Sequence, residues 1–183
     1  GTFIPLINGQ PQPPVPLGPS GTTTYTPTLP ANQANSVGGT VTSPAGNTSP
    51  PASTQTSTVD TQPPTISLDA LSPGAVLNAA EHGQALTVTG TTSGAEAGQT
   101  VHLDVGGVDH TATVKADGTF SVSVPAAAVG ALTDGQHYTL TASVTDQAGN
   151  AAQPATKGLD VDLTAYIGIN AVATDNVVNA QEK

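Results

Sequence analysis

The sequence contains no cysteine, methionine, tryptophan or arginine, and it has only three tyrosines and two phenylalanines. Without cysteine there is no disulfide framework, no thiolate nucleophile and no Cys-based zinc site. No run of 18 apolar residues exists, so we expect no membrane-spanning helix. The N-terminus also lacks the basic and apolar regions of a signal peptide. We therefore expect the sequence to be part of a longer polypeptide whose targeting signals lie elsewhere.

Positive charge is nearly absent as well, since three basic residues stand against thirteen acidic ones and the net charge is −10. Binding to nucleic acid needs clustered cations, so this class of function is excluded, and an anionic membrane surface is disfavoured for the same reason. The sequence has no G-x-S-x-G elbow, phosphate loop or dinucleotide fingerprint, and we expect no enzymatic activity. The excess carboxylates instead favour solubility or divalent cations as counter-charges.

The distribution of charge divides the chain, because residues 1–59 contain no Asp, Glu, Lys, Arg or His but most of the sixteen prolines. Proline fixes φ and removes a backbone donor, so we expect no helix and no central strand over 5–30. Apolar residues are too scattered here to close a core. The sequence predicts an uncharged, non-globular, extended leader or linker over 1–59. It is either a flexible spacer or a segment that a partner holds, as an added strand, as a lining inside a channel, or as a contact between copies of the chain.

Residues 60–162 show period-two alternation of apolar and polar residues, with turn signals every 8–12 residues. The only stretch compatible with a helix, Ala126–Ala131, is about one turn long. Many short alternating strands with Asp-Gly and Gly-Gly turns predict an all-β fold, a seven-stranded Ig-like Greek-key β-sandwich. The predicted strands are Thr65–Asp69, Ala85–Thr91, Thr100–Val105, Val108–Lys115, Thr119–Val124, His137–Thr145 and Thr156–Asp162.

Tyr138 opens one predicted strand directly after the turn at Gly135. This position matches a tyrosine corner, whose hydroxyl bonds the backbone upstream and holds the crossover between the sheets. The alternative is an ordinary half-buried tyrosine.

The end of the chain repeats the start of this domain. The segment from Ile66 to Glu81 returns from Ile167 to Glu182 at a constant offset of 101 residues, and Val59-Asp60 returns as Val161-Asp162, one residue out of step. A period of one sandwich indicates a tandem array. We therefore assign 163–183 to the truncated start of the next repeat, and expect its apolar residues to be exposed or paired outside the first domain.

Four motifs in register carry a resemblance over 60–183. They are Asp60-Thr61-Gln62-Pro63-Pro64-Thr65-Ile66, Val76-Leu77-Asn78-Ala79-Ala80-Glu81, Ala116-Asp117-Gly118-Thr119-Phe120 and Val144-Thr145-Asp146-Gln147-Ala148-Gly149-Asn150. Together they resemble the bacterial Ig-like extender repeats of giant RTX-type biofilm adhesins. The resemblance implies a type I-secreted, extracellular stalk on the outer membrane of a Gram-negative bacterium, with neighbouring Ig-like repeats as its partners in cell adhesion and biofilm formation. It also implies that residues 1–59 could lie within an outer-membrane channel protein and retain the adhesin.

Calcium is the leading candidate ligand, because hard cations bind several carboxylate and carbonyl oxygens. One end of the predicted sandwich would gather Glu81, Asp160 and Asp162, with Asp134 as a possible addition, and the opposite end would gather Asp60, Asp146 and Asn150. The resemblance implies calcium at such junctions between repeats. The alternative is that these residues form turns and a solvated acidic surface.

One further pattern, in the hairpin at Gly106-Gly107, has an ordinary explanation. Asp104 and Asp109 should face each other across the Gly106-Gly107 hairpin beside His102, where they are solvated or share a cation.

A carbohydrate-binding module is the second functional alternative, but only three aromatic residues lie beyond the leader, whereas sugar-binding faces usually present exposed aromatic rings. The sequence as a whole favours a structural stalk module.

Overall fold

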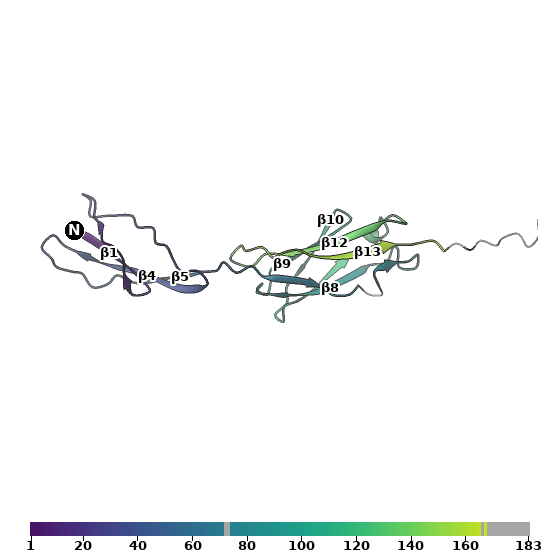
Figure 1. Cartoon of the computed structure of the whole chain (residues 1–183), viewed down its shortest axis with the longest axis horizontal. Helices are drawn as coiled ribbons and strands as arrows, with labels where there is room; N and C mark the ends of the chain where they lie inside the picture. Colours follow the sequence, from purple (N-terminus) through teal and green to yellow (C-terminus); the bar gives the residue numbers. More distant parts are fainter. Residues whose placement is uncertain (72–73, 166, 168–183) are drawn as a thin grey trace, which may run out of the picture.

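The computed structural model describes residues 1–71, 74–165 and 167. It is elongated, with a small sheet formed by the first 59 residues at one end and a β-sandwich beyond it (Figure 1). Ile167 is 85% exposed, as expected for the start of the next repeat, whereas two further apolar residues of that repeat, Ile169 and Val172, lie outside the described residues.

The sandwich consists of a three-stranded sheet in the order β11-β8-β6 and a five-stranded sheet in the order β10-β9-β12-β13-β7. All seven predicted strands are confirmed, with boundaries within about two residues. The only helix in the described part of the chain, α1 (Ala126–Val129), lies in the crossover between β11 and β12. The strands are β6 (Thr65–Leu68), β7 (Val76–Leu77), β8 (Leu86–Ser93), β9 (Thr100–Val105), β10 (Val108–Thr113), β11 (Thr119–Val124), β12 (His137–Val144) and β13 (Ala155–Val161).

One strand of the sandwich was not predicted. β7 is two residues long and pairs in parallel with β13, with Asp160 opposite Val76 and Val161 opposite Leu77. A two-residue strand shows no readable period, and its partner lies more than 80 residues away in the sequence. β7 therefore moves the chain from the three-stranded sheet to the edge of the five-stranded one.

The core lies between the two sheets and follows the predicted alternation. Val101, Leu103 and Val105 of β9 are buried, while the residues between them are exposed. Phe120 of β11 is 1% exposed, and its ring occupies the space beside Gly90 of β8 that a side chain would otherwise take. The close approach of β6, β8 and β11 thus depends on glycine at this position.

Residues 1–59 also form a sheet, with five strands in the order β2-β1-β4-β5 and β3 beside β1. The expectation of no central strand over 5–30 is wrong for Pro5–Ile7, which belong to the central strand β1. The backbone is extended, as predicted, but it is paired. The strands are β1 (Thr2–Ile7), β2 (Gln10–Pro11), β3 (Val15–Pro16), β4 (Gln33–Thr42) and β5 (Gln55–Val59).

Proline is tolerated in β1 because of the direction in which its missing donor would point. The carbonyl of Pro5 accepts a bond from Gln12 N (2.8 Å), on the side of β2 and β3, whereas Asn8 N bonds Ser36 O (2.9 Å) on the side of β4. In an antiparallel strand the N–H and C=O groups of one residue point to the same side. The missing N–H of Pro5 would therefore point away from β4, into the gap between the end of β2 and the start of β3. The ladder to β4 is therefore intact.

Polar contacts replace much of the core in this first sheet. Ile7 is the only large hydrophobic residue among 1–59 that is buried, at 8% exposure, whereas Asn35 is 1% exposed. Asn35 Nδ2 donates to Pro30 O (2.8 Å) and Gln33 O (3.0 Å), and its Oδ1 accepts from Asn8 Nδ2 (3.0 Å) and Gln33 Nε2 (3.2 Å). Every hydrogen-bonding group of this buried amide has a partner, so it joins β1, β4 and the preceding loop.

Candidate functional site

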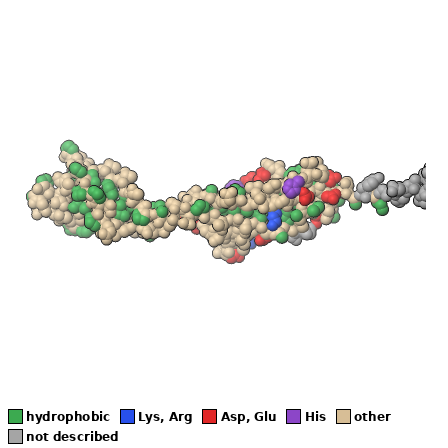
Figure 2. Space-filling model, in the orientation of Figure 1, with side chains coloured by type: hydrophobic (Ala, Val, Ile, Leu, Met, Phe, Trp, Pro, Cys, Tyr) green, Lys and Arg blue, Asp and Glu red, His purple; other side chains and the backbone are tan. Residues whose placement is uncertain are grey.

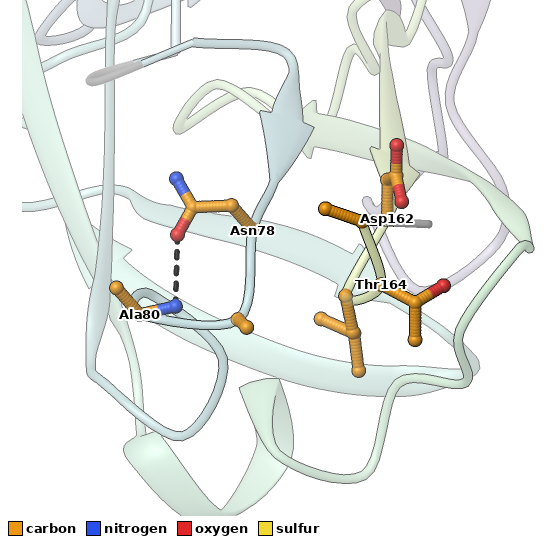
Figure 3. A pocket seen from close by; sticks show the side chains of 7 residues that line it. Asn78, Ala80, Asp162 and Thr164 are labelled. Carbon is orange, nitrogen blue, oxygen red and sulfur yellow. Dashed lines mark hydrogen bonds between the residues drawn. The ribbon is translucent and has the colours of Figure 1, made fainter. Parts of the chain in front are cut away.

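The end of the sandwich from which the chain leaves carries a pocket lined by Asn78–Ala80 and Asp162–Ala165 (Figure 3). Asn78 Oδ1 accepts a bond from Ala80 N (2.9 Å), and Glu81 Oε2 accepts one from Asn78 N (3.1 Å). These reciprocal bonds close the turn after β7, so the carboxylate of Glu81 is used within its own loop.

The other acids predicted at this end are separated rather than gathered. Asp160 Oδ1 lies 2.6 Å from His137 Nδ1 on the outer face of the sheet, with both side chains more than half exposed. Asp162 lines the pocket, while Asp134 Oδ1 accepts a bond from Leu163 N (2.8 Å). The predicted set Glu81, Asp160 and Asp162 therefore does not converge on one point.

The opposite end, next to the first sheet, does bring its predicted residues together. Asn150 donates to Asp146 through its backbone N (2.8 Å, to Oδ1) and its Nδ2 (2.9 Å, to Oδ2), and the same Nδ2 reaches Asp60 O (3.2 Å). This last bond is to the backbone carbonyl of Asp60, while the Asp60 side chain accepts a hydrogen bond from Gln62 N (2.9 Å). Asp146 and Asn150 thus form a hydrogen-bonded turn at the entry of the sandwich, and Asn150 connects this turn to the backbone of Asp60.

Electrostatics at this turn favour a charged Asp146. Burial, the largest influence, acts to raise its pKa, but the side-chain and backbone hydrogen bonds from Asn150, together with those from Gly149 and Ala148, hold the pKa below its ordinary value. The carboxylate is ionised at neutral pH and both of its oxygens already accept hydrogen bonds.

Sequence reasoning missed Glu96 at this end. Its Oε2 accepts a bond from Gln147 N (2.9 Å), and it lines a pocket with Thr58, Asp60, Gln147 and Ala148. The Greek-key topology could have indicated Glu96, because it places the turn between β8 and β9 beside the turn between β12 and β13. Among residues 1–71, 74–165 and 167, no group of three or more His, Cys, Asp or Glu side chains is arranged to hold a metal ion.

The hairpin between β9 and β10 has the predicted register, with Asp109 opposite Asp104. His102 Nδ1 lies 2.8 Å from Asp109 Oδ2, while Asp104 Oδ1 accepts a bond from Gly107 N (3.3 Å). Each carboxylate therefore has a partner of its own, which relieves their opposition.

Tyr138 has the contact expected of a tyrosine corner. Its hydroxyl accepts a bond from Thr133 N (3.0 Å), five residues upstream, and its ring is half-buried against the core. This bond connects the crossover to the start of β12.

The described part of the chain contains no helix that is both long and apolar enough to cross a membrane.

Comparison with known proteins finds solved structures that are similar to this chain. A structure described as giving insight into host cell surface retention of a 1.5-MDa bacterial ice-binding adhesin matches 89% of this chain, at 28% identity and a TM-score of 0.51. A second, described as a Ca²⁺-stabilized adhesin that helps an Antarctic bacterium reach out and bind ice, matches 98% at 27% identity and a TM-score of 0.49. This chain spans about half the length of each, 53% and 45%.

A bacterial immunoglobulin-like domain from the M. primoryensis ice-binding adhesin matches 54% of this chain and 96% of its own length, at 30% identity and a TM-score of 0.43. No curated protein matches the chain in sequence. The sequence model of the family described as bacterial Ig-like domain matches residues 63–163, which is more than half of the chain. The chain belongs to the bacterial Ig-like domain family.

Proposed function

We propose that this chain is a stalk module of a secreted bacterial surface adhesin, and that it transmits load between the cell and a distal adhesive region in cell adhesion and biofilm formation. One observation carries the proposal. The chain enters the sandwich at one end and leaves it at the other, and the strands lie along the long axis (Figure 1). A module of this kind lengthens a chain without turning it back.

The pairing of β7 with β13 suits such a load. Asp160 N donates to Ala75 O (2.8 Å), and Asp162 N donates to Leu77 O (3.0 Å). When the two ends are pulled apart, the parallel strands β7 and β13, which belong to the first and last parts of the sandwich in the sequence, slide past each other, so their hydrogen bonds are loaded together. Bonds that must break together resist force better than bonds that open one by one.

Force spectroscopy on the full chain between handle domains tests this function. Asp162→Pro removes the donor to Leu77 O, and we expect a lower unfolding force, whereas Asp162→Ala keeps the donor and should unfold at the wild-type force without calcium. If the two variants unfold at the same force as the wild type, the strand pair does not carry the load and the proposed function loses its support.

The surface of the sandwich favours spacing over ligand binding. Phe120 is buried and Tyr138 is half-buried with its hydroxyl engaged, so neither presents an open ring to a sugar. Acidic side chains are visible only over the sandwich in Figure 2. A glycan array checks the point, because specific binding by the described domain would favour the carbohydrate-binding alternative.

Calcium remains part of the proposal at the junctions between modules. At the entry, hydrogen bonds of Asn150 join Asp146 and the backbone of Asp60, and Glu96 lines a pocket with Asp60. Carboxylate and carbonyl oxygens are the ligands that calcium prefers. At the exit, where Glu81, Asp160 and Asp162 lie apart, a calcium ion would need most of its ligands from a following repeat. Calorimetric titration of a two-domain chain tests this, since absence of heat and of a melting shift would remove calcium from the proposal.

Retention at the cell surface is the second candidate function. It is favoured by the similarity, over 89% of this chain, to the structure whose description concerns cell-surface retention. The first 59 residues would then contact an outer-membrane channel protein. Deletion of 1–59 in the native adhesin tests it, because unchanged retention on cells and unchanged co-purification with outer-membrane protein would contradict this role.

A further inference from the structure

The two edges of the first sheet differ in how they treat their free backbone groups. On one edge, Pro11 of β2 pairs with Leu6 and Pro16 of β3 pairs with Thr2. Both prolines occupy positions whose backbone would face away from β1, so this edge offers no donor there. Proline at an open edge is a common means of preventing the addition of another strand.

The opposite edge, formed by β5, has no such protection. Its sequence is Gln-Thr-Ser-Thr-Val, without charge or proline, and residues 55–58 are exposed. Among the described residues, β5 pairs only with β4, with Ser57 opposite Asn35 and Gln55 opposite Val37. An uncharged and open edge is suited to pairing with another strand.

The register shows which groups of β5 are free. Even-numbered residues of β4 face β1, because Asn8 N bonds Ser36 O, and odd-numbered ones face β5, because Ala52 N bonds Gly39 O. Pairs such as Ser57 with Asn35 therefore exchange hydrogen bonds. The N–H and C=O groups of Thr56 and Thr58 then point outward, away from β4.

We propose that β5 is a self-association edge, which pairs antiparallel with β5 of a second copy of this chain about a two-fold axis at Ser57. In that register Thr56 lies opposite Thr58 of the partner, and each of these pairs exchanges both N–H···O bonds. Ser57 lies opposite the partner's Ser57, at a pair that needs no such bonds. The strand is thus complementary to itself, as a two-fold interface requires.

A second copy is the occupant that the charge distribution favours. The whole net charge of −10 lies beyond residue 59, so contact through the first sheet brings no carboxylates together. Antiparallel pairing also directs the two sandwiches away from each other. In addition, this sheet buries only one large hydrophobic residue, Ile7, so it gains from each backbone bond that a neighbouring strand supplies.

Concentration-dependent experiments on the full chain test the self-association. Sedimentation equilibrium up to about 0.5 mM should show a monomer–dimer equilibrium, as weak interfaces of this kind do. Amide exchange measured by NMR should slow at Thr56 and Thr58 as concentration rises, while Ser57, already bonded to β4, should change little. A monomer at every concentration would overturn the proposal and leave the edge to a different strand.

Charge variants test the register. The pair Thr56→Lys with Thr58→Lys places like charges opposite each other and should weaken dimerisation roughly tenfold. The matched pair Thr56→Glu with Thr58→Lys places opposite charges there and should restore dimerisation to within about threefold of the wild type. Both side chains are exposed, and circular dichroism checks that each variant is folded. A dimer that is insensitive to both pairs would show that β5 is not the interface.

Discussion

Substitution of Gly90 by alanine tests whether the close packing of β6, β8 and β11 depends on glycine at this position. Gly90 of β8 pairs with Phe120 on one side and Leu68 on the other. An added Cβ there would overlap both the Ser67 carbonyl oxygen and the Phe120 ring. Neither can yield easily, because the first is backbone of a paired strand and the second lies at 1% exposure in the core.

The expected cost follows from this overlap. Overpacking in a filled core costs about 1–3 kcal/mol, and displacement of β6 adds to it, so we expect Gly90→Ala to lower the free energy of unfolding by about 3 kcal/mol. For a domain of this size the melting temperature falls roughly 4–8 °C per kcal/mol, which predicts a decrease of about 12–24 °C. Differential scanning calorimetry measures both quantities.

Gly158→Ala is the matched control, because this glycine also lies within a strand, β13. The added Cβ would meet only the imidazole of His137, at 2.8 Å, and that side chain is 60% exposed and can turn away at the expense only of its exposed contact with Asp160. We expect a change between zero and a stabilisation of about 1 kcal/mol, since alanine restricts the unfolded chain. Equal melting temperatures for Gly90→Ala and Gly158→Ala would refute the steric argument.

Three further predictions concern hydrogen bonds. Tyr138→Phe removes the acceptor for Thr133 N and should cost about 1 kcal/mol, measured by urea denaturation; an unchanged midpoint would mean that the corner contributes nothing. Asn35→Leu leaves the partners of the amide unpaired and should destabilise the first sheet by roughly 2–4 kcal/mol. Hydrogen exchange should then rise over residues 1–59 while the sandwich stays protected, and equal loss in both would contradict this. Asp146 has a lowered folded pKa, so its stabilisation is present above the ordinary value of 3.8 and is lost as pH falls through the folded pKa. The free-energy difference between wild type and Asp146→Asn should therefore be constant above about pH 5 and shrink at lower pH, and a difference independent of pH would disprove it.

The sandwich was predictable because its signal is local. Each strand has a buried face that repeats every second residue, and turns such as Asp117-Gly118 separate the strands clearly. The candidate sites were less predictable. Which acids share an end of the sandwich follows from topology, which is why Asp60 was placed with the turn of Asp146 and Asn150, but the partner of a side chain depends on register. His137 lies opposite Asp160 only because β12 and β13 align as they do.

The first sheet was not predictable for a different physical reason. Composition indicated that no core could form, and indeed Ile7 is its only large buried hydrophobic residue. Stability comes instead from features that have no periodic pattern. Asn8 and Asn32 adopt left-handed backbone conformations, and their side chains bond Ser36 N (2.8 Å) and Thr61 N (2.8 Å). The second of these bonds connects the first sheet to the start of the sandwich.

A sheet of this composition has little hydrophobic stabilisation of its own, and this links its folding to its association with a second copy. Folding must offset the backbone entropy of every ordered residue, and only one large hydrophobic side chain of this sheet, Ile7, is buried. The backbone ladder and the Asn35 network must offset most of that cost, so one additional strand at β5 would stabilise the sheet substantially. Association and folding of the first 59 residues should therefore be coupled: variants that weaken dimerisation at Thr56 and Thr58 should also lower the concentration-dependent part of this sheet's stability, without affecting the sandwich.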